Sequence, residues 1–185
     1  MVERATQRVA ATVATMITDL VQIRLLGEKK RGENERLRRH MKSRDHSDRI
    51  LRRVAQGIEE QIDCTTCANC CRHVSPMLSE EDVARLASHL GMSHDEFIAK
   101  YLDKTESDPE FPWMMRIKPC PFLKDNRCSV YEHRPGTCRG YPYLNKPDLV
   151  SRTMGMIDRT AVCPAVFEVW EELKRETGFR RDRRR

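Results

Sequence analysis

The sequence predicts an α+β fold: a small cysteine-rich module, mostly helices and loops with a short β-hairpin, preceded by an α-helical N-terminal arm. Three observations predict it. All eight cysteines fall after residue 63, apolar residues recur at helical spacing before that point, and Pro- and Gly-rich stretches interrupt the sequence after it. Because only 39% of the 185 residues are hydrophobic and 6% aromatic, we expect a modest core to which a bound metal would add folding energy.

The arm is predicted over residues 1–62. Its expected helical stretches are 3–26, about 33–41 and about 45–62. Gly27 and Gly32 mark a predicted break after the first stretch. Amphipathic helices gain most of their stability from tertiary packing. We therefore expect the arm to pack on the module, on a protein partner or on a second copy of the chain.

Two short helices are predicted at the start of the module. Ser79 followed by Asp82 resembles a capping box, in which two side chains satisfy the free amides of a helix start. That helix is expected to end at Gly91, a residue type common just beyond a helix. Ser93 and Glu96 form a second capping box and open the next helix.

Short strands are predicted after these helices. WMMRIK (113–118) reads as a strand, and PFLKDNRCSVY (121–131) as a hairpin that turns at KDN. The following segment, 132–147, is too rich in Pro and Gly for regular structure, and we expect metal ligation at Cys138 to hold it.

A final helix is predicted after Cys163, with Pro164 in its first turn. The predicted domains are the helical arm (1–62), the cysteine-cluster metal-binding domain (63–176) and a basic, disordered tail (177–185).

The segment CTTCANCCRH, residues 64–73, concentrates four cysteines in eight positions. Two cysteines separated by two residues can turn both sulfurs toward one metal, and thiolates suit zinc and iron–sulfur clusters. Cys70 and Cys71 are neighbours, and neighbouring side chains of an extended segment diverge. Two centres or one multinuclear cluster are therefore both open. The candidate metal ligands are Cys64, Cys67, Cys70, Cys71, Cys120, Cys128, Cys138 and Cys163.

Positive side chains lie beside the cysteines in the sequence. Four thiolates around a divalent zinc leave a local charge of about −2. Arg72, His73, Arg134 and Arg139 could offset it or donate hydrogen bonds to sulfur, and the alternative for each is a plain surface residue. His73 could instead be a ligand or a proton carrier.

Composition and charge bear on location and partners. No stretch approaches the roughly 20 apolar residues that span a bilayer, and the first residues do not resemble a signal peptide. We therefore expect a cytoplasmic protein, whose thiols stay reduced and serve as ligands rather than disulfides. The net charge is +6, but the basic excess lies at the two ends and the cysteine-bearing middle is negative, which argues against nucleic-acid binding.

Four blocks occur in a characteristic order. They are CTTCANCCR (64–72), LSEEDVARLASHLGMSHDEFIAKYL (78–102), CPFLKDNRCSVYEHRPGTCRGYP (120–142) and CP (163–164). In this combination the sequence resembles the YkgJ-type cysteine cluster proteins, also named for a zinc- or iron-chelating domain with a CxxCxxCC motif. The resemblance implies a module that holds zinc or an iron–sulfur cluster. One departure is Ala68–Asn69, where many relatives have a glycine before the third cysteine.

The predicted function is metal binding, of zinc or an iron–sulfur cluster, through the CxxCxxCC motif and the four downstream cysteines. The alternative is an iron–sulfur redox or group-transfer enzyme, either an oxidoreductase or protein methylase-like. A similar cysteine motif occurs in flagellin lysine N-methylases, but this chain is shorter than those enzymes, so the resemblance does not carry their activity over. The sequence contains no Gly-rich phosphate loop, nucleophile elbow or HExxH motif. No catalytic residue is therefore assigned.

Overall fold

The structure is a computed structural model that describes residues 17–43, 48–144, 146 and 152–179. The chain divides into two compact units. We call Met1–Ile62 with Pro142–Arg185 the helical unit, and Asp63–Tyr141 the cysteine unit. The predicted α+β class is confirmed, because helices are combined with a few short antiparallel strands.

The helical unit is built from amphipathic helices. They are α2 (Leu20–Lys29), α3 (Arg31–Ser43), α4 (Asp48–Glu59), α10 (Thr153–Arg159) and α11 (Pro164–Glu176). The carboxylate of Asp19 caps α2 by accepting from the amide of Gln22 at 2.7 Å, and Pro164 occupies the first turn of α11 as predicted. Much of the predicted stretch 3–26 lies outside the described residues.

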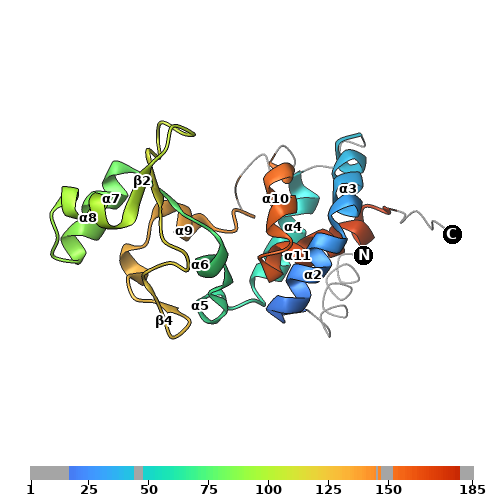
Figure 1. The fold of residues 1–185 in the computed structure, drawn as a ribbon. Helices are drawn as coiled ribbons and strands as arrows, with labels where there is room; N and C mark the ends of the chain where they lie inside the picture. The colour runs from blue at the N-terminus through green and yellow to red at the C-terminus, as the bar shows by residue number, and fades with distance from the viewer. Residues whose placement is uncertain (1–16, 44–47, 145, 147–151, 180–185) are drawn as a thin grey trace. The chain divides into compact units, whose positions relative to one another are not determined.

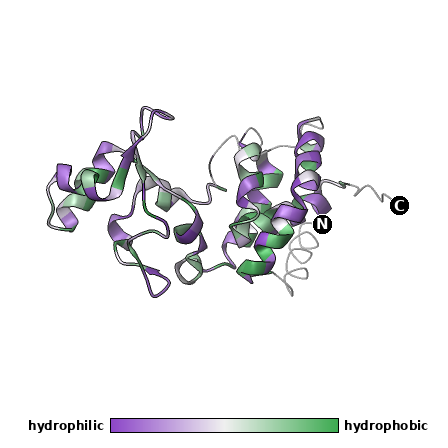
Figure 2. Cartoon of the chain, viewed as in Figure 1, coloured by the Kyte–Doolittle hydropathy of each residue, from purple (hydrophilic) through white to green (hydrophobic). Residues whose placement is uncertain are grey.

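The core of this unit forms where α11 packs on α4, α2 and α10 (Figure 1). Trp170 and Phe167 of α11 and Leu51 of α4 are almost fully buried. In Figure 2 these helices carry both hydrophobic and hydrophilic residues, as a helix with one buried face requires.

The predicted break between Gly27 and Gly32 is smaller than expected. Helices α2 and α3 are interrupted only at Lys30, so both glycines are helical. Gly27 lies against the backbone of Thr160 and Ala161, where an added Cβ would be only 2.5 Å from the Ala161 Cα atom. The glycine therefore permits close packing rather than breaking the helix.

The cysteine unit begins with helices. They are α5 (Cys64–Cys67), α6 (Asn69–His73), α7 (Glu80–His89), α8 (His94–Tyr101), the 3-10 turn η2 (Tyr131–His133) and α9 (Gly136–Gly140). Both predicted capping boxes are confirmed: Ser79 accepts from the amide of Asp82, and Ser93 from that of Glu96. Gly91 follows α7 with a φ of +66°, which glycine adopts readily.

Two small antiparallel sheets complete the unit. The strands are β1 (Met77–Leu78), β2 (Leu102–Lys104), β3 (Trp113–Met115), β4 (Leu123–Lys124) and β5 (Arg127–Cys128). The order in the first sheet is β1-β3-β2, and β4 and β5 form the predicted hairpin. Asp125 and Asn126 make its tight turn with φ of +47° and +62°, values that suit a two-residue hairpin loop.

The segment 132–147, predicted to be irregular, contains part of η2 and all of α9. The prediction missed these short elements because their support comes from α7 and β1, which lie far away in the sequence. Within the described residues, no helix is long and apolar enough to cross a membrane.

The C-terminal part of the predicted metal-binding domain, 63–176, is divided between the units. Residues 142–176 contribute α10 and α11 to the helical unit, because the apolar face of α11 packs on α4. Compact packing does not by itself mark a domain, so the boundaries inferred from the sequence stay a prediction. The predicted tail 177–185 lies mostly outside the described residues.

Candidate metal centre

The CxxCxxCC segment folds into two short helical turns. The carboxylate of Asp63 caps α5 by accepting from the amide of Thr65 at 2.8 Å. Ala68 then adopts a left-handed conformation with a φ of +51°, which separates α5 from α6. All four cysteines of the motif lie on these two turns.

From the sequence, Cys70 and Cys71 are expected to lie in an extended segment, where their side chains would diverge, but the segment is helical. They are both in α6, and their thiols are hydrogen-bonded to each other. Cys71 is further joined to a downstream segment, since its carbonyl accepts from the amide of Cys120 at 2.8 Å. This bond places the segment that begins at Cys120 beside the last cysteine of the CxxCxxCC segment.

The β4–β5 hairpin contains the next cysteine, Cys128, and packs on the CxxCxxCC segment. Cys128 lies on β5, opposite Leu123 of β4, and α5 packs on β5. The guanidinium of Arg72 donates to the carbonyl of Cys67 at 3.1 Å and also to the side chain of Asn126 in the hairpin turn. Arg72 therefore ties the CxxC turn to the hairpin.

Cys138 lies in α9, which packs on β1. Its amide donates to the carbonyl of Pro135 at 2.9 Å. The neighbouring Thr137 hydroxyl donates to the carbonyl of Met77 at 2.7 Å, which holds α9 to the strand.

The electrostatics indicate that four of these thiols lie close together. Burial raises the pKa of Cys138 to about 12, and the neighbouring thiols of Cys120, Cys71 and Cys128 raise it further. Burial also raises the pKa of Cys120 to about 11, with the same effect from Cys71 and Cys128. Each thiol would destabilise a negative charge on the next, as expected where several sulfurs share a partly buried place.

Cys71 differs from the others. The hydrogen bond from Cys70 lowers the pKa of Cys71 to about 7, against the effect of burial and with help from the charge of Arg72. Burial raises the pKa of Cys128, and the charge of Arg134 opposes this. The Arg134 guanidinium stacks on the Tyr131 ring at 3.6 Å from its centroid.

The remaining predicted site residues are distributed over both units. Cys64 is exposed and Cys67 half-buried, both on α5, and His73 is exposed at the end of α6. Cys163 is buried at the start of α11 in the helical unit. Arg139 contacts the carbonyl of Arg134 at 3.0 Å.

The donor chemistry and the side-chain arrangement agree only in part with a metal site. Seven cysteines lie in the cysteine unit, and none of the eight, all of which are described, forms a disulfide. Four thiols from separate segments converge, and soft thiolates are the ligands that zinc and iron favour. Within the described residues, however, no three His, Cys, Asp or Glu side chains are already arranged as a metal-binding group. Ligation requires the sulfurs to lose protons and to close on the ion.

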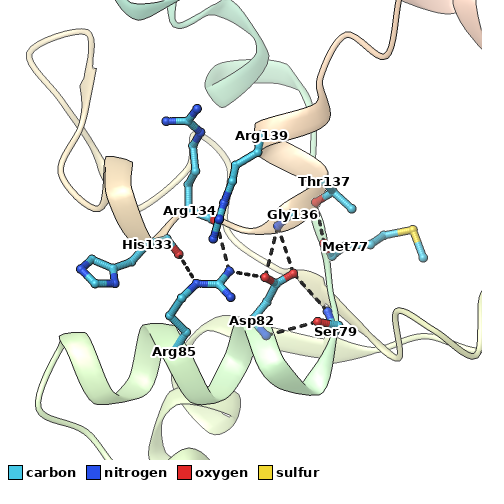
Figure 3. A network of polar contacts seen from close by, with 9 residues as sticks. All are labelled: Met77, Ser79, Asp82, Arg85, His133, Arg134, Gly136, Thr137 and Arg139. Atoms are coloured by element: carbon cyan, nitrogen blue, oxygen red, sulfur yellow. Dashed lines mark hydrogen bonds and ion pairs between the residues drawn. The ribbon is translucent and has the colours of Figure 1, made fainter. Parts of the chain in front are cut away.

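A polar network that the sequence pattern did not predict holds the Cys138 segment. Asp82 was expected only to cap α7, but its buried carboxylate also accepts from the amide of Gly136 (Figure 3). Arg85 donates to Asp82 and to carbonyls of the same segment. The capping box was the available signal, but it identifies only the local role of Asp82.

Comparison with known families gives one match. A family described as "CxxCxxCC: Putative zinc- or iron-chelating domain" matches residues 63–164, more than half of the chain. Neither the curated proteins nor the solved structures that were compared include a match.

Proposed function

Because the chain belongs to the family of the zinc- or iron-chelating CxxCxxCC domain, we propose that it is a metal-binding protein whose main centre uses four thiolates. The proposed ligands are Cys71, Cys120, Cys128 and Cys138. The observation that carries the proposal is their convergence: they come from α6, the turn before β4, strand β5 and helix α9, yet each lies close enough to influence the ionisation of another.

The number and type of these donors fit the metals of the family. Four thiolates complete the tetrahedral shell of a structural zinc site, and four cysteines also hold a common iron–sulfur cluster. Both arrangements leave excess negative charge, which a protein must compensate. Arg72, beside Cys71, and Arg134, beside Cys128 and Cys138, are placed to do so.

When bound, the metal would link four segments, of which only β5 belongs to a sheet. The sheets of the cysteine unit are short, with strands of two or three residues. A centre that joins α6, the hairpin and α9 therefore supplies stability that the modest core does not. We infer that organising this unit is the first role of the metal.

Cys64, Cys67 and Cys70 form a second group on α5 and α6 of the same unit. They are candidates for a second centre, or for further ligands of a multinuclear cluster. Ligation by Cys163 stays a prediction from the sequence, because that cysteine belongs to the helical unit.

Anaerobic purification followed by metal analysis, sulfide analysis and an absorption spectrum tests the proposal. We expect a stoichiometric amount of zinc or iron. Zinc without visible absorption identifies a structural ion, and iron with equimolar acid-labile sulfide and a brown colour identifies a cluster. Alkylation of the metal-loaded protein, read by mass spectrometry, should find the four proposed ligands protected. A protein that contains no metal and gains no protection with Zn²⁺ or Fe²⁺ would overturn the proposal.

A further inference from the structure

Asp82 connects helix α7 to the segment that carries Cys138. It is 4% exposed, and both its carboxylate oxygens accept from the amide of Gly136 at 3.2 Å. The amide of Ser79 also donates to it, at 3.4 Å, in the capping box. Gly136 begins α9, the short helix that contains Cys138. The buried carboxylate of Asp82 is thus bonded to the backbone two residues before Cys138, a proposed metal ligand.

Arg85 extends this contact along the same segment. Its guanidinium donates to the carboxylate of Asp82 and to the carbonyls of His133 at 3.4 Å and Arg134 at 3.2 Å. Figure 3 shows Asp82 and Arg85 rising from one helix toward consecutive parts of the opposite segment. Both side chains therefore fix backbone atoms from His133 to Gly136, which belong to no sheet.

Other contacts also hold the segment. Thr137 donates to the carbonyl of Met77, His133 stacks on His89, and the amides of His133 and Arg134 donate to the carbonyls of Val130 and Tyr131. Pro135 is buried and Cys138 half-buried, so packing also contributes to the position of the segment. The hydrogen bonds from α7 reach its backbone at His133, Arg134 and Gly136, and they help to set the place of Cys138 relative to the other thiols.

We propose that Asp82 and Arg85 are positioning residues of the metal centre, which hold Cys138 where the other three thiolates can share a metal with it. The inference rests on the proposed function. We refer to the contacts of Asp82 and Arg85 with residues 133–136 as the α7 latch. Groups that orient metal ligands without touching the metal commonly change metal affinity by about 10- to 100-fold when they are removed.

A purely structural role for Asp82 makes a different prediction. If it only stabilised the unit, its loss would loosen all four thiols alike. The latch contacts only the Cys138 segment, so its loss should release Cys138 while the other ligands stay bound. The rates at which individual cysteines are alkylated distinguish the two roles.

The test compares Asp82→Asn with wild type and with Ser79→Ala, each purified anaerobically with its own metal. Asparagine has nearly the same shape, but it loses the ion pair with Arg85 and one acceptor oxygen. Ser79→Ala removes the other half of the capping box and destabilises the start of α7, while it leaves the latch in place. It is therefore a matched control for destabilisation.

We expect Asp82→Asn to raise the alkylation rate of Cys138 at least about ten-fold, with little change at Cys71, Cys120 and Cys128, and to speed metal loss to a chelator. Ser79→Ala should change neither rate. If Asp82→Asn does not fold, Arg85→Gln, which keeps the Asp82–Gly136 contact, should still raise the Cys138 rate selectively. Unchanged protection of Cys138, or an equal rise at all four cysteines, would overturn the latch alone. A wild-type protein whose cysteines are never protected by metal would overturn the proposed function as well.

Discussion

The amide of Cys120 donates a 2.8 Å hydrogen bond to the carbonyl of Cys71. Two cysteines that are far apart in the sequence are thereby joined through the backbone, before any metal is considered. Their thiols are also near enough that, in addition to burial, a charge on Cys71 raises the pKa of Cys120. We therefore expect Cys71→Ser and Cys120→Ser to have the same effect: loss of most bound metal and a lower melting temperature.

Metal analysis and a thermal melt of both variants check this expectation. Ser129→Ala, an exposed position next to Cys128, is the control and should keep the metal. Cys163→Ser examines the wider prediction of eight ligands: a metal loss as large as that of Cys71→Ser would add Cys163 to the ligand set. Full metal content in Cys71→Ser would remove Cys71 from it.

Gly27→Ala should destabilise the helical unit although alanine is the better helix former. The added Cβ would lie 2.5 to 2.6 Å from backbone atoms of Thr160 and Ala161, which cannot move as a side chain can. We expect a loss of about 2 kcal/mol, typical of overpacking. Gly32→Ala is the matched control: its Cβ would meet only the end of the Arg36 side chain, at 4.0 Å, so it should gain up to about 1 kcal/mol. Equal changes in the free energy of unfolding for both variants, measured in urea, would contradict the close approach of Gly27 to Thr160 and Ala161.

Glu171 should contribute stability that disappears in acid. Burial raises its pKa, but hydrogen bonds and charges from Lys174 and Lys30, each 2.6 Å away, outweigh burial and hold the pKa below its usual range. A carboxylate with a lowered folded pKa stabilises the fold above its unfolded pKa of about 4.3, and this stability is lost as the pH falls through the folded value. Glu171→Gln should therefore cost about 2 kcal/mol at pH 7, and less below about pH 4.

The ionisation of Glu168, one turn earlier on α11, should have the opposite effect on stability. Burial raises its pKa and the neighbouring Glu171 adds to the effect, while its carboxylate accepts from the amide of Ile17 at 2.7 Å. Its ionisation therefore weakens the fold as the pH rises above about 4. Relative to wild type, Glu168→Gln should gain stability between pH 4 and 7, where Glu171→Gln loses it. If the stability of both variants changes with pH in the same way, the ion pairs of Glu171 with Lys30 and Lys174 do not cause the opposite pKa shifts of the two carboxylates.

Ala68→Gly should stabilise the turn between α5 and α6. Ala68 has a φ of +51°, and a left-handed conformation costs a residue with a Cβ about 1 kcal/mol that glycine does not incur. We expect a gain of up to about 1 kcal/mol in the metal-loaded protein, measured by urea unfolding. Ala84→Gly, at an exposed position inside α7, should lose about 1 kcal/mol. Losses in both variants would mean that the turn stores no strain.

Local features of the sequence were sufficient for many of the elements. The capping boxes at Ser79 and Ser93, the proline at the start of α11 and the Asp125–Asn126 turn act on neighbouring backbone groups. Their geometry is fixed within a few residues, so the helices and the hairpin they predict are found. The family followed from four sequence blocks in a characteristic order, which can be read without knowing how the chain folds.

Other elements could not be predicted because their support lies far away in the sequence. Strands β1 and β2 are two and three residues long and exist only through pairing with β3. Helix α9 interrupts a segment that looked irregular, since its start is bonded to Asp82 and its side to β1. Such contacts leave no periodic signal in the segment that receives them.

The candidate site also has features that the sequence predicts and features that only the fold shows. The sequence by itself determined the donor type, eight cysteines suited to zinc or iron, and the α+β class in which they lie. Only the tertiary structure decided that Cys71, Cys120 and Cys128 lie near enough to Cys138 to affect its ionisation, and that Asp82 holds the segment of Cys138. The physical reason is that ligand identity is a property of a side chain, whereas the meeting of four ligands depends on hydrogen bonds between distant segments of backbone.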